Sequence, residues 1–133
     1  MNPEIDPKPR SSDFLREKMR KLEGAYLARL PETLTTILEL RSTLAADPDA
    51  ETVIADLHRT FHSMRGTAAT LGLQQISSQG AIGEELMLSF RGMPPDQRRH
   101  DLVSTLGQID ACIARIEAAG AEASMLLAGP GGD

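Results

Sequence analysis

The sequence predicts an all-α fold, an antiparallel up-down four-helix bundle with an additional N-terminal helix. Apolar residues recur at spacings of three and four over long segments, which is the period of an amphipathic helix. Short links containing proline or glycine join these segments and favour antiparallel neighbours. Aromatic residues are scarce, so the core must be built from Leu, Ile, Met and Ala, the usual residues of helical bundles.

The first two helices are expected on either side of Pro31. The Ser-Ser-Asp sequence at 11–13 offers N-caps for a helix that runs to about residue 30. Pro31 is expected to end this helix and to occupy the first turn of the next, which covers about 31–46. Residues 1–10 carry three prolines among polar neighbours and are expected to form a disordered lead-in.

The third helix, roughly residues 50–72, has the clearest pattern in the chain. One apolar stripe with spacings of four, three, four and three is formed by Leu57, Phe61, Met64, Ala68 and Leu71. Asp49 is expected to be the N-cap of this helix. Gly72 occupies the position where a left-handed C-cap is usually needed.

Two further helices are expected over 73–91 and 95–119, separated by Gly92 and the Met-Pro-Pro-Asp sequence. The apolar side of the first is formed by Leu73, Ile76, Ile82, Leu86, Met87 and Phe90, and that of the second by Leu102, Leu106, Ile109, Ile113 and Ile116. Gly80 and Gly83 either allow the helix over 73–91 to approach the third helix closely or mark a kink in it.

Residues 120–133 lose most of the pattern and end in Gly-Pro-Gly-Gly-Asp, so we expect a flexible tail or linker there. The bundle domain is therefore expected to cover residues 11–119.

Composition excludes several classes of function. The net charge is −5 and no Lys/Arg cluster is interleaved with aromatics, which argues against binding to nucleic acid or to an anionic membrane surface. No stretch approaches the roughly 18 apolar residues of a membrane span. The single cysteine, Cys112, cannot form an internal disulfide and is expected to be a packing residue. We therefore expect a cytoplasmic protein.

One histidine of the third helix lies away from the apolar stripe. At about 100° per residue, His62 is roughly 140° from the centre of the stripe. Arg65 and Gly66 stand beside it, with Ala69 one turn further. A neutral imidazole has a lone pair that can attack phosphorus, and Arg65 could stabilise the phosphoryl charge. Gly66 costs the helix about 1 kcal/mol, which makes sense if a partner must approach the backbone.

The run HSMRGTAATLG, which begins at His62, resembles the signature of histidine phosphotransfer (HPt) domains. That signature has a histidine, a small polar residue, an apolar residue, Lys or Arg, Gly, and then small residues before Leu-Gly. The upstream sequence YLARLPETL resembles the start of the bundle in HPt modules. The likeness spans most of 13–119 in organisation and about 57–84 in specific residues.

The resemblance implies that His62 is phosphorylated on its outer ring nitrogen and that Arg65 takes the place of the family's Lys or Arg. It also implies that Glu84, like the acidic residue of chemotaxis kinase phosphotransfer domains, hydrogen-bonds the inner ring nitrogen. Ala81 departs from that subfamily, which often has a second histidine there. The residues expected at the partner interface are His58, Ser63, Gly66 and Ala69.

The function implied is a phosphoryl carrier in a two-component phosphorelay. It would pass a phosphoryl group between receiver-domain aspartates, or take one from a histidine kinase. It would not be an enzyme, since no nucleotide-binding loop is present. We expect no cofactor or metal bound by this chain, Mg²⁺ supplied by the partner receiver domain, and a monomer.

Other interpretations remain open. His62 could be an idle surface histidine in a structural adaptor, and Arg65 an ordinary surface cation. Glu84 could pair with solvent or with a neighbouring base. His58 and His62, one turn apart, could bind zinc with Glu84. The dimerising segment of a sensor kinase is a further alternative, although Ser63 stands where those segments usually have an acidic residue.

Overall fold

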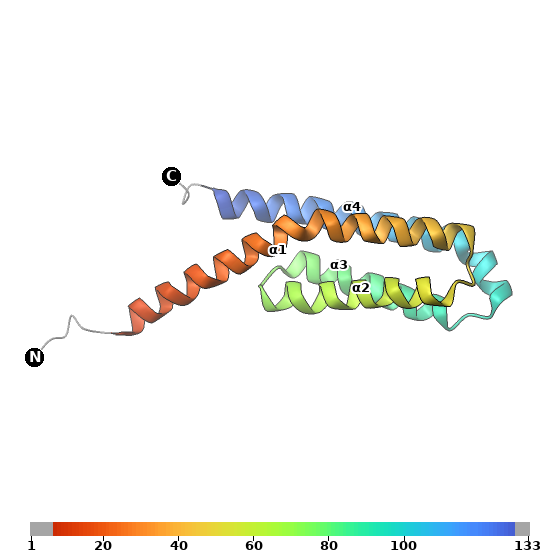
Figure 1. The fold of residues 1–133 in the computed structure, drawn as a ribbon, viewed down its shortest axis with the longest axis horizontal. Coiled ribbons are helices and arrows are strands. Elements are labelled where there is room, and N and C mark those ends of the chain that lie inside the picture. The colour runs from red at the N-terminus through yellow and green to blue at the C-terminus, as the bar shows by residue number, and fades with distance from the viewer. Residues whose placement is uncertain (1–6, 130–133) are drawn as a thin grey trace, which may run out of the picture.

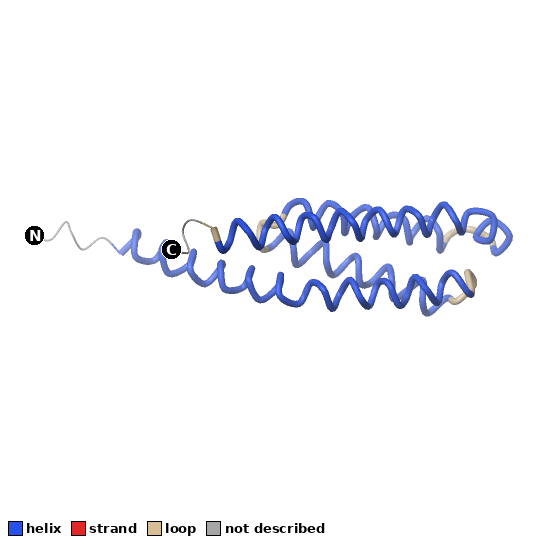
Figure 2. The backbone as a smooth tube through the Cα atoms, turned by 90° about the horizontal axis from the view of Figure 1, so that it is seen from above, coloured by secondary structure: helices blue, strands red, loops and turns tan. Residues whose placement is uncertain are grey.

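The computed structural model describes residues 7–129, which form four helices and no strand. They are α1 (Pro7–Ala46), α2 (Glu51–Thr70), α3 (Gln74–Arg91) and α4 (Pro95–Ala128). Each helix packs against two neighbours, because α1 contacts α2 and α4, and α3 contacts the same two helices (Figures 1 and 2). The predicted antiparallel four-helix bundle is thus confirmed. Within residues 7–129, none of the helices has the length and apolarity needed to cross a bilayer.

The expected additional N-terminal helix is wrong, because α1 continues through Pro31 as one helix of 40 residues. Its buried stripe crosses the proline without a change of period and consists of Leu27, Leu30, Leu34 and Ile37. A proline inside a helix costs about 3 kcal/mol. Burial of each such apolar side chain is worth about 1.5–3 kcal/mol, so packing on both sides of Pro31 offsets the cost. Pro31 itself is exposed, and α1 changes direction where its N-terminal part leaves the bundle (Figure 1).

The helix ends predicted near residues 11 and 119 are also wrong. Helix α1 begins at Pro7, inside the expected lead-in, and α4 continues to Ala128, inside the expected tail. The α1–α4 contact extends past residue 119, since a Cβ on Gly120 would lie 2.7 Å from a methyl carbon of Leu30. The Arg20 guanidinium also donates a hydrogen bond to the carbonyl of Leu127 (3.0 Å). The parts of these two predictions that concern 1–6 and 130–133 lie outside the described residues.

The core follows the predicted stripes of α2, α3 and α4 with one exception. All five residues of the α2 stripe are buried, as are Ile76, Met87 and Phe90 of α3. Ile82 is exposed, contrary to expectation, because Gly80 and Gly83 lie on the buried side of α3 in its place. Cys112 is buried within the core.

Gly72 ends α2 in the left-handed conformation that the sequence predicts, with φ of 77°. The amide of Leu73 donates to the carbonyl of Ala68 (2.8 Å), and the amide of Gly72 donates to that of Ala69 (3.1 Å). This pair of hydrogen bonds is the Schellman motif. It satisfies carbonyls at the end of α2 and turns the chain directly into α3.

Helices α2 and α3 approach each other closely at two glycines. A Cβ on Gly80 would lie 2.9 Å from the backbone nitrogen of Arg65, and a Cβ on Gly83 would overlap the ring of Phe61. The hydroxyl of Ser77 donates to the carbonyl of Arg65 across the same interface (3.0 Å). Of the two interpretations of these glycines, the structure confirms close helix–helix approach.

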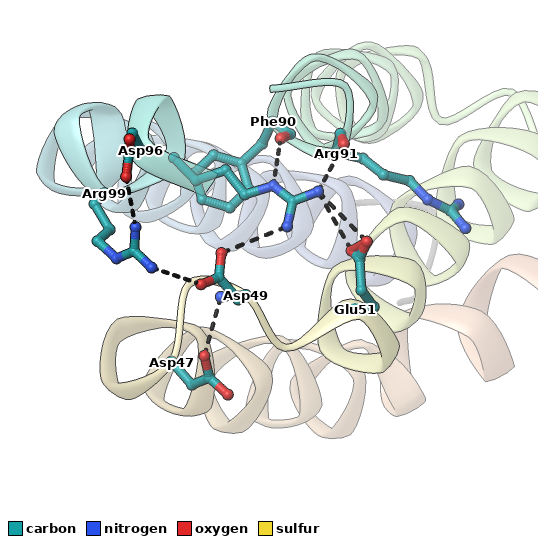
Figure 3. A network of polar contacts seen from close by, with 8 residues as sticks. Asp47, Asp49, Glu51, Phe90, Arg91, Asp96 and Arg99 are labelled. Carbon is teal, nitrogen blue, oxygen red and sulfur yellow. Dashed lines mark hydrogen bonds and ion pairs between the residues drawn. The ribbon is translucent and has the colours of Figure 1, made fainter. Parts of the chain in front are cut away.

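A buried arginine, Arg98 of α4, joins three elements at the opposite end of the bundle from Gly72. Figure 3 shows the polar network at this end, with Asp49, Glu51, Phe90 and Arg91 labelled. The Arg98 guanidinium donates to the carbonyls of Phe90 (3.3 Å) and Arg91 (2.8 Å), which are left free at the end of α3. It also forms ion pairs with Asp49 (3.7 Å) and Glu51 (3.4 Å). Asp49 therefore pairs with arginine, and α2 has no side-chain N-cap, contrary to the interpretation of Asp49 from the sequence.

The glycine contacts generate a stability prediction. We expect Gly83→Ala to lower the free energy of unfolding by about 1–3 kcal/mol, because the new methyl group must displace the Phe61 ring in a packed core. Urea unfolding followed by circular dichroism measures this change. The matched control is Gly107→Ala in α4, where a Cβ meets no atom within 4 Å; we expect it to stabilise the protein by about 0.5–1 kcal/mol. Equal effects of the two substitutions would contradict the close-approach interpretation.

Candidate functional site

Helix α2 presents three polar side chains to one residue of α3. His58, His62 and Arg65 are separated by four and three residues, so they lie along one face of α2. Glu84 of α3 lies opposite them, one residue after the close contact at Gly83. The site therefore depends on the distance between the two helices, which the glycines of α3 make short.

His62 and Glu84 form the central contact of the site. The distance between Nδ1 of His62 and Oε2 of Glu84 is 2.6 Å. The imidazole is 58% exposed, whereas the Glu84 side chain is only 12% exposed. The inner nitrogen of an accessible ring is thus held by a largely covered carboxylate, in the arrangement that the resemblance to HPt domains implies.

The surroundings of Glu84 keep it ionised. The hydrogen bond from His62 lowers the pKa of this carboxyl below its ordinary value near 4.5, and the positive charge of Arg65 lowers it further. Burial raises the pKa, but by less than the hydrogen bond lowers it. Arg65 pairs with the second carboxylate oxygen, Oε1, at 3.1 Å. Near neutral pH, Glu84 is therefore an acceptor with no proton to donate.

This electrostatic state fixes the role of each nitrogen in the His62 ring. A carboxylate can only accept hydrogen bonds, so Nδ1 of His62 must carry the hydrogen in the 2.6 Å contact. In the neutral ring, Nε2 then carries the lone pair. The geometry therefore leaves a free lone pair on the outer nitrogen of an exposed imidazole, and an orienting carboxylate of this kind also increases the basicity of the ring.

The small residues near His62 leave its surroundings open. Ser63, Gly66 and Ala69 are all exposed, and a Cβ on Gly66 would meet no atom within 4 Å. Gly66 therefore has no role in packing within the described part of the chain, unlike the two glycines of α3. The surface beside the imidazole is free for another molecule to approach.

His58 has a contact that the sequence does not reveal. Its Nε2 lies 3.7 Å from Oε2 of Glu84, the same oxygen that His62 uses, and its side chain is 24% exposed. The two imidazoles stack with their centroids 6.2 Å apart and an angle of 17° between their planes. Among residues 7–129, no group of three or more His, Cys, Asp or Glu side chains is arranged to hold a metal ion.

The sequence interpretation missed one of the residues that hold the two helices together at the site, Ser77, whose hydroxyl donates to the carbonyl of Arg65. Small residues repeat at intervals of three on the side of α3 that faces α2, at Ser77, Gly80 and Gly83. The sequence interpretation placed only the two glycines at this interface. The regular series of small residues at this spacing is the signal that could have added Ser77 to the expected interface.

The sequence model of the Hpt domain family matches residues 21–119 of the chain. The chain belongs to the Hpt domain family. Membership implies histidine phosphotransfer in two-component signalling, and Hpt domains are phosphoryl carriers rather than enzymes. The family also implies partners such as receiver domains or kinases. Searches of curated proteins and of solved structures gave no match.

The Hpt site predicts a specific dependence of stability on pH. The folded state lowers the pKa of Glu84, so the stabilisation by its carboxylate is complete above the unfolded-state pKa near 4.5 and is lost as the pH falls through the lower folded-state value. We expect the stability difference between wild type and Glu84→Gln to shrink below about pH 4.5. Urea unfolding between pH 3 and 7 measures it.

The matched control is Glu85→Gln, which removes an exposed carboxylate that forms no ion pair within residues 7–129. We expect its stability to follow that of wild type at every pH. A wild-type profile parallel to that of Glu84→Gln would show that Glu84 has no favourable partners in the folded state.

Proposed function

We propose that this Hpt domain carries a phosphoryl group on Nε2 of His62, between receiver-domain aspartates or from a histidine kinase. The observation that supports this most directly is the 2.6 Å contact between His62 and Glu84 on a ring that is 58% exposed. The contact commits Nδ1 and leaves Nε2 free, and the exposure makes Nε2 accessible to the active site of a partner.

The transfer step follows from this arrangement. The lone pair on Nε2 attacks the phosphorus of a receiver phospho-aspartate, a P–N bond forms, and the P–O bond to aspartate breaks with its electron pair left on the carboxylate. The ring keeps its hydrogen on Nδ1 and becomes cationic, and Glu84 stabilises that charge. Donation to a second receiver reverses the step.

Two further components complete the proposed mechanism. Arg65 is 48% exposed and one turn from His62, so its guanidinium can contact the phosphoryl oxygens during transfer. The partner receiver domain supplies Mg²⁺, which neutralises the charge that develops on the transferring group. The Hpt domain contributes a positioned nucleophile, and this chemistry requires little else from it.

We propose that the domain works as a monomer in the cytoplasm. Its four helices close a ring within one chain, whereas a two-helix kinase segment must dimerise to form a bundle. The free thiol of Cys112 is consistent with a reducing compartment. Light scattering that gave the mass of a dimer would contradict the monomer.

Phosphoryl transfer tests the proposal directly. Labelled receiver domains and histidine kinases should transfer label to the wild-type chain, and the label should be labile to acid and stable to base, as expected for phosphohistidine. His62→Gln should accept none and keep its circular dichroism spectrum, since the ring is exposed. Labelling of His62→Gln to the wild-type level would place the phosphoryl group on another residue.

The open surface at Gly66 gives a prediction for docking. We expect Gly66→Leu to fold normally and to accept phosphoryl groups at least 10-fold more slowly, because the added side chain occupies the space into which the partner must move. The matched control is Gly107→Leu on α4, where a Cβ also meets no atom within 4 Å and whose backbone does not pack against α2. An undiminished rate in Gly66→Leu would show that the partner does not approach this part of the helix.

A further inference from the structure

One carboxylate of α3 serves three groups of α2. Oε1 of Glu84 pairs with Arg65 at 3.1 Å. Oε2 lies 2.6 Å from Nδ1 of His62 and 3.7 Å from Nε2 of His58. The oxygen that orients the proposed nucleophile therefore has a second imidazole on its other side, and the proposed transfer step does not use that imidazole.

The position of Oε2 must be fixed by something other than His62 if it is to orient the ring. A glutamate side chain is flexible, and holding it in one conformation has an entropic cost. Arg65 is a weak anchor, because its side chain is long and 48% exposed and it holds the other oxygen. His58 is 24% exposed, rotates about only two side-chain bonds and is stacked against the His62 ring, so it is the more rigid neighbour.

We propose that His58 is a positioning residue for phosphoryl transfer, which acts by holding Oε2 of Glu84 against Nδ1 of His62. An N–H group on Nε2 of His58 attracts Oε2 and keeps the carboxylate turned toward α2. The carboxylate in turn keeps the hydrogen of His62 on Nδ1 and the lone pair on Nε2. This inference rests on the proposed function of His62 and assigns to His58 a role inside the site, in place of the expected contact with a partner.

The surroundings of His58 support a contact with Glu84 alone. The neighbouring Arg59 forms an ion pair with Asp56 at 2.8 Å and leaves Glu84 to His58, His62 and Arg65. Within residues 7–129, Glu84 is the only acidic side chain paired with His58. The carboxylate of Glu84 is thus the one acidic partner of His58 in the described part of the chain.

Two substitutions at His58 separate positioning from packing. His58→Leu keeps an apolar side chain of similar bulk but removes the N–H group, whereas His58→Gln restores an N–H donor at a similar distance along the side chain. Arg59→Gln is the control, because it changes the next residue and removes a charge without a contact to Glu84. Each variant is studied as the full chain.

The first measurement is the ¹⁵N NMR spectrum of His62, which reports the hydrogen on each ring nitrogen and requires no phosphoryl donor. We expect the Nδ1–H form to lose population in His58→Leu and to be retained in His58→Gln and Arg59→Gln. An unchanged tautomer in His58→Leu would overturn the inference, whatever the transfer rate.

The second measurement is the transfer rate from a receiver domain that labels the wild type, together with the affinity for that receiver. Partners that orient metal-binding histidines are typically worth 10- to 100-fold. The His58 contact is longer and acts through Glu84, so we expect a smaller loss, roughly 3- to 10-fold, in His58→Leu. The rate should recover in His58→Gln, and the affinity should not change. Weaker receiver binding with an unchanged tautomer would make His58 a partner contact and overturn the inference.

The two proposals fail in different ways. A wild-type chain that accepts no phosphoryl group from receivers or kinases would contradict the proposed function, and with it any role of His58 in transfer. A wild-type chain that is phosphorylated on His62, with a tautomer and rate indifferent to His58→Leu, would contradict the role of His58 alone.

Discussion

The close packing of α2 against α3 is the constraint on which the site depends. Gly80 and Gly83 have no side chains, so the backbone of α3 lies against Arg65 and Phe61 at distances that any Cβ would prevent. A glutamate on the next residue then reaches the imidazole of His62 at 2.6 Å. Each glycine inside a helix costs about 1 kcal/mol relative to alanine, and the Phe61 ring buried against Gly83 offsets part of that cost. The interaction that builds the core and the one that orients the His62 ring are therefore the same helix–helix contact.

The electrostatics of the site follow from the burial of most of one carboxylate, that of Glu84. An ionised group that is largely removed from water is costly unless charged or polar partners replace the water. Arg65 and His62 supply those partners from a single face of α2, and His58 adds a third polar edge. In pairing with Glu84, the helix commits the inner nitrogen of His62 and leaves the outer one free on an exposed ring. The requirement of the buried acid thus determines which nitrogen is available for chemistry.

The rest of the bundle keeps this pair of helices in place. The Schellman motif at Gly72 joins α2 to α3 at one end, and at the other end Arg98 ties the last carbonyls of α3 to the start of α2 through Glu51. Helices α1 and α4 complete the ring on the other side, with their contact continued to Gly120. The bundle thus holds the proposed nucleophile in one position, and positioning is the main requirement of a phosphoryl carrier.

The sequence by itself determined the class of fold and the identity of the candidate nucleophile. The stripe from Leu57 to Leu71 placed α2, and the same period left His62, Arg65 and Gly66 on the opposite side, because a helix with one buried face must expose the other. The break at Pro31 was predicted wrongly, since local rules for proline do not include the apolar side chains that α4 and α2 cover on both sides of it. Tertiary structure alone decided that three glycines with the same chemistry have two different roles, with Gly80 and Gly83 against α2 and Gly66 facing open space. It also decided that His58 shares an oxygen of Glu84, because 26 positions separate the two residues along the chain and only the docking of α3 on α2 brings them to 3.7 Å.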